Sequence, residues 1–382
     1  MMGGQTENDD AMIWFLQKAN GGDVVVVRST GSDGYNNYMY SQLGVNVNSV
    51  ETLVITSAEG AIHPYVLDKI SNAEAIWFAG GNQANYVNFF KNNAFEDALN
   101  AHINVKQGAV GGTSAGMAIL GNYYYAALGN SVTSAQALGN PFHQNITLGG
   151  NDFLDIPFLQ EVITDTHYNN PDRRGRHTVF MARIAADNNI RAKGIACDEY
   201  VAVCIDQTGI AKVFGSFPQY QDFAYFLQVD CEDEFLPQTL QANQSLTWNN
   251  NGVGIRAYRV PATGDGANQF DLNTWESGVG GTWQHWTVNA GVMSYNAGEA
   301  PDCVLSNQTP TRTGGIIYPN PFKHQIVIQY DLFKSVEIYD IRGSLVLKSQ
   351  EKNLNLSDVP NGIYVVKITT ELGLDTKLMV KE

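Results

Sequence analysis

Residues 112–116 read Gly-Thr-Ser-Ala-Gly, a spacing that can present Ser114 as a nucleophile. They lie between an apolar pair at 109–110 and a helix-like stretch that begins near residue 115. In a strand-to-helix turn this spacing puts the serine on a tight bend, with glycines where side chains would clash. Backbone N–H groups at the start of the helix can then hold an oxyanion. The pattern predicts a nucleophilic serine, although ordinary Gly-rich turns share it.

A nucleophilic serine needs a base, and the base needs an orienting group. His167 is the best placed of the seven histidines because it follows a predicted strand that ends on the side of Ser114. Glu199 is the candidate acid, since it interrupts an apolar strand-like run in which an unpaired carboxylate is costly to bury. A structural histidine and a structural ion pair are the alternatives. If Glu199 points away, Asp198 or Asp165 has to replace it.

The elements that must position these residues alternate between helix and strand over the first 130 residues. Residues 10–19 have helical spacing, and the apolar runs at 24–27, 52–55 and 75–79 are predicted strands. Gly-Gly-Asn-Gln at 80–83 closes the last of these strands. Ligands bind at the carboxyl ends of strands in such sheets, so this loop and Ser114 are expected at one site.

Further helix and strand patterns follow Ser114. They are a helix over 178–186, a hairpin with strands at 195–206 and 210–215, and strands at 223–229 and 255–260. Residues 249–298 are rich in Asn, Gly and Trp without a clear period, and are expected to extend the same domain.

Composition narrows the classes of protein. The chain has 382 residues, enough for two domains, and a formal net charge of −15, which argues against nucleic-acid binding. No stretch approaches the ~20 consecutive apolar residues of a membrane helix. The cysteines lack C-x-x-C spacing, so no metal site is expected. Cys197 and Cys204 should not form a disulfide with each other. The sequence does not decide whether Cys231 and Cys303 form one.

The last part of the chain differs from the rest in charge. Residues 316–382 hold eight basic and eight acidic residues, so the net negative charge lies before them. A polar segment at 306–315 is the predicted linker. The β-rich runs after it lie at 326–328, 336–339, 345–347, 364–366 and 377–380. Their spacing predicts a small β-sandwich.

Four segments resemble, in order, the motif blocks of the cyanophycinase family, which are serine peptidases of family S51 related to the α-aspartyl dipeptidases. They are Gly-Gly-Asn-Gln at 80–83, Gly-Thr-Ser-Ala-Gly at 112–116, Asp-Thr-His-Tyr at 165–168 and Gly-Ile-Ala-Cys-Asp-Glu at 194–199. The resemblance implies an α/β fold, a flavodoxin-like or class I glutamine amidotransferase-like three-layer sandwich with a mostly parallel sheet. The order Ser…His…Glu argues against the α/β-hydrolases, in which the acid precedes the histidine.

The resemblance also implies roles for single residues. Ser114 would be the nucleophile, His167 the general base and Glu199 its orienting carboxylate. The backbone N–H groups of Gly81 and Ala115 would form the oxyanion hole. Gln83 would contact the substrate.

Asp165, Thr166, Arg173 and Arg176 are further expected substrate contacts. The family usually has Gln where this chain has Thr166. Its arginines after the histidine suit an aspartyl carboxylate because the guanidinium fork binds carboxylates bidentately. Here only an R-x-x-R spacing remains, with Pro-Asp at 171–172 in place of the first arginine. Solvated charges on a helix are the alternative for these arginines.

Residues 316–382 resemble the type A C-terminal sorting domain of the type IX secretion system. The segments that carry this are Tyr-Pro-Asn-Pro at 318–321, residues 337–343, Asn-Gly-Ile-Tyr at 361–364 and the terminal lysines at 377 and 381. The resemblance implies export to the cell surface or medium, with the secretion machinery as a partner. A signal peptide and a strand before Gly3 are expected of such a protein, and neither is visible. The sequence is therefore predicted to lack its signal peptide and its first strand, with a real but defective short form as the alternative.

The sequence thus predicts a peptidase domain over 1–305, with 231–305 as an extension of uncertain role, a linker over 306–315 and a sorting domain over 316–382. The expected function is hydrolysis of β-aspartyl isopeptide bonds, in β-Asp-Arg units of cyanophycin or related peptides, without metal or organic cofactor. The alternatives are an exported peptidase for α-aspartyl or other acidic peptides and a non-catalytic surface binding protein on the same scaffold. The sequence does not determine the oligomeric state, and a homodimer is one of the alternatives.

Overall fold

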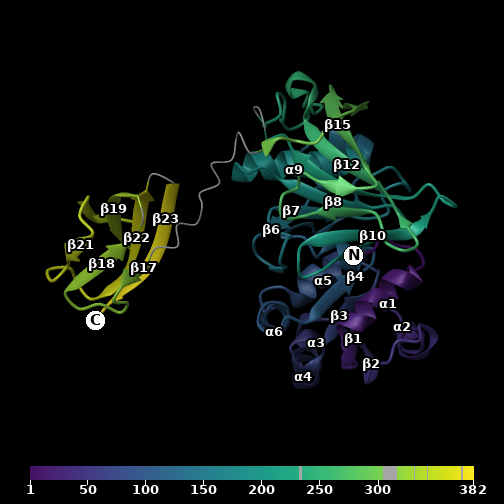
Figure 1. Ribbon diagram of the computed structural model, residues 1–382, viewed down its shortest axis with the longest axis horizontal. Helices are drawn as coiled ribbons and strands as arrows, with labels where there is room; N and C mark the ends of the chain where they lie inside the picture. Colours follow the sequence, from purple (N-terminus) through teal and green to yellow (C-terminus); the bar gives the residue numbers. More distant parts are fainter. Residues whose placement is uncertain (232–234, 304–315, 331, 342, 371–372) are drawn as a thin grey trace. The chain divides into compact units, whose positions relative to one another are not determined.

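The structure is a computed structural model that describes residues 1–231, 235–303, 316–330, 332–341, 343–370 and 373–382. The chain divides into two units, Met1–Asp302 and Cys303–Glu382 (Figure 1). The predicted linker at 306–315 lies outside the described residues.

A parallel four-stranded sheet forms the first part of the larger unit. Its strands run in the order β2 (Ser49–Val54), β1 (Asp23–Arg28), β3 (Ala75–Phe78) and β4 (Ala109–Gly112). The apolar runs at 24–27, 52–55 and 75–79 are therefore strands, as predicted. Their β-branched and aromatic side chains suit a sheet that is buried on both faces.

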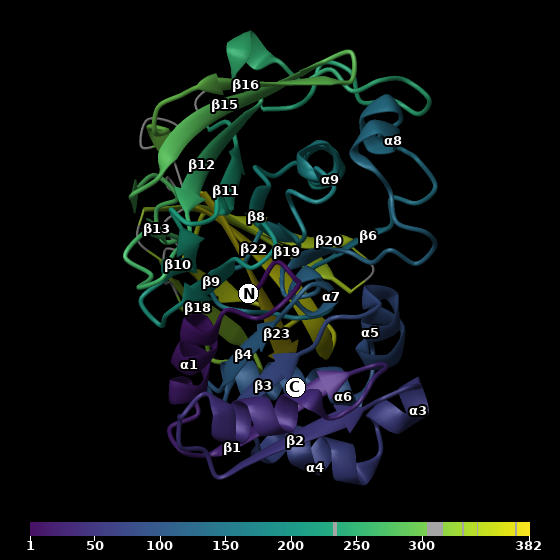
Figure 2. The ribbon, with the colours of Figure 1, turned by 90° about the vertical axis from the view of Figure 1, so that its right-hand side faces the viewer.

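Helices cover both faces of this parallel sheet (Figure 2). Val24 and Val26 pack with α1 on one face, while Val25 and Val27 belong to the core on the other face, because successive strand side chains alternate. The helices are α1 (Asp9–Lys18) on the first face and α3 (Ala58–Ala61), α4 (Pro64–Asn72), α5 (Gln83–Phe90) and α6 (Ala94–Asn104) on the second. This part is the predicted three-layer α/β sandwich.

The first residues of the chain connect two sheets. Met2 bridges Thr113, just after β4, in parallel and Ala202 in antiparallel orientation. Ala202 begins β9, which belongs to a sheet of order β14-β13-β10-β9. The strands of that sheet are β9 (Ala202–Ile205), β10 (Ile210–Phe217), β13 (Gln269–Asp271) and β14 (Gly278–Val279). The first residues of the sequence given thus lie in a strand-like position.

A mixed eight-stranded sheet of order β16-β15-β12-β11-β8-β7-β5-β6 forms the other part of the larger unit. Its strands are β5 (Tyr123–Tyr125), β6 (Leu148–Gly150), β7 (Val162–Asp165), β8 (Lys193–Cys197), β11 (Phe223–Val229), β12 (Ile255–Pro261), β15 (Thr282–Asn289) and β16 (Val292–Ala297). The neighbours β5, β7 and β8 are parallel, while β8, β11, β12, β15 and β16 pair antiparallel. The segment of unassigned role at 249–298 therefore extends this sheet and the β9–β10 sheet.

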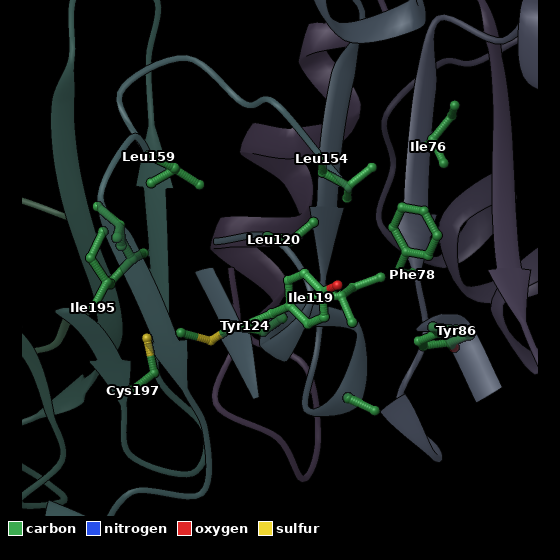
Figure 3. Close-up of a cluster of buried hydrophobic side chains, with 14 of the residues drawn as sticks. Ile76, Phe78, Tyr86, Ile119, Leu120, Tyr124, Leu154, Leu159, Ile195 and Cys197 are labelled. Atoms are coloured by element: carbon green, nitrogen blue, oxygen red, sulfur yellow. The ribbon is translucent and has the colours of Figure 1, made fainter. Parts of the chain in front are cut away.

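A continuous apolar core lies between the parallel sheet and the eight-stranded sheet (Figure 3). Ile76 and Phe78 enter it from β3, and Ile195 and Cys197 enter it from β8. Tyr124 of β5 and neighbouring aliphatic side chains fill the space between them. This packing fixes the distance between the loops that end β4, β7 and β8. On the other face of the eight-stranded sheet pack α8 (Ser134–Gly139) and α9 (Arg174–Asn188).

One predicted strand is wrong. The run at 195–206 is two strands, β8 and β9, which belong to different sheets. The chain turns at 198–201, where Tyr200 has a φ of 65°. Glu199 therefore lies in a loop and not inside a strand. The turn between β9 and β10 is the predicted hairpin.

The cysteines fall into two pairs. Cys197 and Cys204 are buried and free, as predicted, and they lie in the two different sheets. Cys231 and Cys303 are both disulfide-bonded, a question that the sequence did not decide.

The smaller unit is a β-sandwich with its own core. It has one antiparallel sheet of order β17-β18-β21 and a second of order β20-β19-β22-β23. The strands are β17 (Ile316–Tyr318), β18 (Gln325–Gln329), β19 (Phe333–Asp340), β20 (Leu345–Ser349), β21 (Asn353–Asn355), β22 (Gly362–Thr370) and β23 (Gly373–Lys381). Ile326, Val336 and Ile368 are among the side chains buried between the sheets.

The core between the sheets predicts a large difference between two leucine truncations. Leu99 on α6 is fully buried, whereas Leu128 is half exposed. We expect Leu99→Ala to lower the free energy of unfolding by roughly 2–5 kcal/mol, because it removes buried methyl groups and leaves a cavity. Leu128→Ala should change it by less than about 0.5 kcal/mol. Urea denaturation of both variants checks this, and equal effects would contradict the packing described.

Candidate active site

Ser114 lies on a tight turn between β4 and the short helix α7 (Ala115–Ala118). Its φ of 51° and ψ of −117° are unusual for a residue with a side chain and cost about 1–3 kcal/mol. The Ser114 N–H donates to the Met2 carbonyl at 3.1 Å, which helps to hold the turn. A Cβ atom at Gly116 would lie 2.1 Å from the Phe78 carbonyl oxygen, so the second glycine of the motif permits the close approach of α7 to β3.

Three side chains form a continuous chain of hydrogen bonds. The Ser114 Oγ lies 2.8 Å from His167 Nε2, and His167 Nδ1 lies 2.7 Å from Glu199 Oε1. His167 follows the end of β7, and Glu199 follows the end of β8. Because β4, β7 and β8 each end at the same site, the structure brings together the three residues that the sequence proposed. An alcohol, an imidazole and a carboxylate in this order can activate the alcohol as a nucleophile.

The Glu199 carboxylate is held by more than the histidine. Gln5 Nε2 donates to Oε1 at 3.1 Å, and Asn170 Nδ2 donates to Oε2 at 3.3 Å. The Glu199 backbone N–H donates to Asn169 Oδ1 at 3.1 Å. Burial works to raise the pKa of Glu199, but the hydrogen bonds from His167, Gln5 and Asn170 outweigh it and hold the pKa below its usual value. The carboxylate is therefore ionised at neutral pH and can stabilise a protonated His167.

Gly81 and Ala115, whose backbone N–H groups are the expected oxyanion hole, lie in the loop after β3 and at the start of α7. A Cβ atom at Gly80, the neighbour of Gly81, would lie 3.5 Å from the Ser114 Cβ. Within the described part of the chain, the N–H groups of Gly81 and Ala115 donate no hydrogen bond. Gln83, at the start of α5, donates its side-chain amide to the Tyr125 carbonyl at 2.9 Å.

Asp165 and Arg176 pair with each other in the interior. Arg176 Nε donates to Asp165 Oδ2 at 2.8 Å and Nη2 donates to Oδ1 at 2.5 Å, and the residues are 3 and 4% exposed. Burial works to raise the pKa of Asp165, but the guanidinium beside it holds the pKa below its usual value. The structure thus places these two expected substrate contacts in a closed ion pair. Thr166 is buried beside them, and its N–H donates to Asp165 Oδ1.

Arg173 differs from its neighbouring arginines. Arg174 pairs with Asp172 and stacks on Tyr295. Arg173 Nη1 donates to the Thr166 carbonyl at 3.0 Å, and among the described residues it has no carboxylate partner. Its Nε is buried without a hydrogen bond in that part of the chain. Burial, and then the charge of Arg176, lower the pKa of Arg173, so an arriving anion would relieve an unfavourable charge.

Asp198, the other acid named as an alternative, and the buried His177 lie outside the hydrogen-bond chain that begins at Ser114. Asp198 accepts from the Phe223 N–H, and burial raises its pKa to about 7. His177 is fully buried between Tyr168 and the Ile163 carbonyl, and burial lowers its pKa to about 4.

The sequence motifs do not mark Gln5, Asn169 or Asn170 as part of the site. Nothing in the local sequence pairs Gln5 with Glu199, because 194 positions separate them.

Comparison with known proteins supports the class of enzyme that this arrangement suggests, a serine hydrolase. Residues 29–213 match the family model described as peptidase family S51. Residues 316–382 match the model of the secretion system C-terminal sorting domain. No curated protein matches the chain.

Two solved structures are weakly similar in fold. One is a peptidase from an acI-B1 Actinobacterium, at 16% identity and a TM-score of 0.39, with 56% of this chain and 86% of that chain covered. The other is a putative peptidase E protein from Listeria monocytogenes EGD-e, at 16% identity and a TM-score of 0.35, with 56% of this chain and 96% of that chain covered.

The chain therefore carries a domain of peptidase family S51 and is a serine-type peptidase, as its motifs predicted. Its C-terminal sorting domain directs export through the type IX secretion system to the cell surface or outside, and implies interaction with that machinery. Among the described residues, no helix has both the length and the apolar composition to cross a membrane.

The Asp165–Arg176 pair predicts a pH-dependent loss of stability. Arg176→Ala leaves an unpaired buried carboxylate, so we expect the free energy of unfolding to fall by roughly 3–5 kcal/mol at pH 7. In wild type the depressed pKa of Asp165 stabilises the fold above the unfolded pKa. In the variant, burial without a partner raises the pKa of Asp165 in the folded state. The loss in free energy of unfolding relative to wild type should therefore shrink as pH falls towards about 4. Urea denaturation at several pH values measures this, and a constant deficit would contradict it.

Proposed function

We propose that this protein is an exported serine peptidase that hydrolyses β-aspartyl isopeptide bonds through Ser114, His167 and Glu199. The proposed substrates are β-Asp-Arg units of cyanophycin or related peptides. The observation that carries the catalytic assignment is the hydrogen-bond chain from Ser114 Oγ through both nitrogens of His167 to Glu199. The resemblance of the motif blocks to cyanophycinases supports the substrate.

In the proposed mechanism, His167 Nε2 takes the Ser114 hydroxyl proton while Oγ attacks the scissile carbonyl. Glu199 holds the imidazole in the tautomer with its proton on Nδ1 and stabilises the imidazolium. The amides of Gly81 and Ala115 then donate to the carbonyl oxygen as it gains negative charge. His167 next gives its proton to the leaving amine, and the same groups act on water to release the acyl group.

Arg173 is the proposed anchor for the free carboxylate of the aspartyl residue. It is the arginine of the R-x-x-R pair that stays without a carboxylate partner among the described residues, because Arg176 is taken by Asp165. It also contacts Thr166, the residue next to the proposed base. A partly buried guanidinium binds a carboxylate more strongly than an exposed one does, because less water competes.

The carboxylate anchor serves both possible linkages. In an α-linked and in a β-linked aspartyl peptide, the same two carbons separate the scissile carbonyl from the free carboxylate. The linkages differ in which of these carbons bears the nitrogen. Arg173 therefore accounts for aspartyl preference, whereas the choice between α- and β-linkage depends on groups that contact this nitrogen. An α-aspartyl peptidase is the second candidate function.

Parallel assays of α- and β-linked Asp-Arg dipeptides test the proposal. We expect faster release of arginine from the β-linked peptide, and loss of at least about 10⁴-fold in Ser114→Ala, since that variant has no nucleophile. Ser294→Ala, an exposed serine on β16, is the matched control and should keep full activity. Activity that survives Ser114→Ala would overturn the mechanism, whereas cleavage of only the α-linked peptide would overturn the substrate.

Substitution of Arg173 tests the carboxylate anchor. We expect Arg173→Ala to raise KM for an aspartyl peptide by about 10- to 100-fold, and Arg173→Lys to recover only part of this because it lacks the planar fork. The rate at which a fluorophosphonate labels Ser114 should stay close to that of wild type, because this reagent carries no carboxylate. Arg183→Ala, on the same helix and paired with Asp187, is the control. Unchanged KM in Arg173→Ala would exclude the anchor.

A further inference from the structure

The first residues of the chain contact each of the three proposed catalytic segments. The Met2 carbonyl accepts from the Ser114 N–H at 3.1 Å, and the Gly3 carbonyl accepts from the His167 N–H at 2.7 Å. The Gly4 carbonyl accepts from the Tyr200 N–H at 3.1 Å, next to Glu199. Three successive carbonyls thus bind the loops that follow β4, β7 and β8.

Further backbone hydrogen bonds anchor this segment to the end of β4 and to the residues around the start of β9. The Met2 N–H donates to the Gly112 carbonyl, and the Gly3 N–H donates to the Val201 carbonyl, each at 2.9 Å. Met1 exchanges hydrogen bonds with Val203 in both directions. Residues 1–4 therefore form a short extended segment between the end of β4 and the start of β9, and displacement of it would disturb both sheets.

Gly4 passes directly over the catalytic imidazole. Its φ is 119°, a region that favours glycine, and a Cβ atom there would lie 2.3 Å from His167 Cε1. The Gly4 backbone consequently packs directly against the His167 ring. No side chain fits between the segment and the histidine.

Gln5 completes the contact with the third catalytic side chain. Its amide donates to Glu199 Oε1, the same oxygen that faces His167 Nδ1. A second donor on that oxygen restricts rotation of the carboxylate and keeps its lone pair directed at the imidazole. Gln5 itself is exposed, with a φ of 66°, so its side chain contributes little to the core.

We propose that residues 2–5 are the positioning segment of the catalytic triad, and that Gln5 is the positioning residue that orients Glu199. The inference rests on the proposed catalytic roles of Ser114, His167 and Glu199. Gln5 acts through Glu199 and touches neither substrate nor the reacting atoms. The backbone carbonyls of residues 2–4 set the positions of the three loops, and the Gln5 amide sets the orientation of the acid.

The charges around Glu199 determine how a test by pH must be designed. His167, Arg173 and Asp222 act on it electrostatically, and Asp198 is its neighbour in the chain. These groups are present both in wild type and in variants of Gln5. A ratio of variant to wild-type rate at each pH therefore removes their contribution.

The test measures the rate at which a fluorophosphonate labels Ser114 between pH 5 and pH 8, which needs no knowledge of the natural substrate. We expect Gln5→Ala to lower this rate about tenfold, the effect of one lost hydrogen bond to a charged group. Gln5→Glu should label at close to the wild-type rate at low pH, where the neutral carboxyl group still donates to Glu199. Its rate relative to wild type should fall about tenfold or more as pH rises, because two carboxylates then repel each other.

Gln17→Glu, an exposed substitution on α1 that adds the same charge, should follow wild type at every pH. Thermal unfolding midpoints of the Gln5 variants should stay within about 2 °C of wild type, because the side chain is exposed. Wild-type rates for Gln5→Ala, or a pH-independent ratio for Gln5→Glu, would overturn the positioning role and leave the catalytic proposal intact. Absence of labelling at Ser114 in wild type would instead overturn both.

Discussion

The Glu199 carboxylate must remain ionised although the fold buries most of it, and the rest of the site is arranged around this requirement. A carboxylate in such a position is unfavourable unless donors replace its lost hydration. Gln5 at the start of the chain, and His167 and Asn170 in the loop after β7, supply these donors. The His167 N–H also donates to the Gly3 carbonyl, so the charge of one side chain connects the loops after β7 and β8 with the start of the chain.

The two arginines of the R-x-x-R spacing likewise differ in whether a carboxylate compensates their charge. Arg176 neutralises Asp165 at the end of β7, where an isolated carboxylate would destabilise the strand that leads to His167. Arg173 stays without an anionic partner among the described residues and lies closer to the surface. One arginine thus supports the scaffold and the other is available to a ligand, although their side chains are chemically identical.

Local patterns predicted the strands and the serine turn because each depends on residues that are close in sequence. The β-branched run at 24–27 and the aromatic run at 75–79 are buried strands for the reason that their composition suggests. Ser114 lies on the predicted turn because only glycine fits where Gly116 approaches the Phe78 carbonyl. The apolar run at 195–206 was misleading, because it supplies strands to two sheets and the turn between them carries no glycine or proline.

The sequence by itself determined the class of enzyme, the exported tail, and the identity of Ser114, His167 and Glu199 as one set, since these follow from motifs with characteristic spacing. Only the tertiary structure decided that Asp165 binds Arg176, that Arg173 remains available, and that Gln5 reaches Glu199. These are contacts between side chains separated by up to 194 positions. Their partners are chosen by burial and by the order of strands in the sheets, and neither is encoded in the spacing of neighbouring residues.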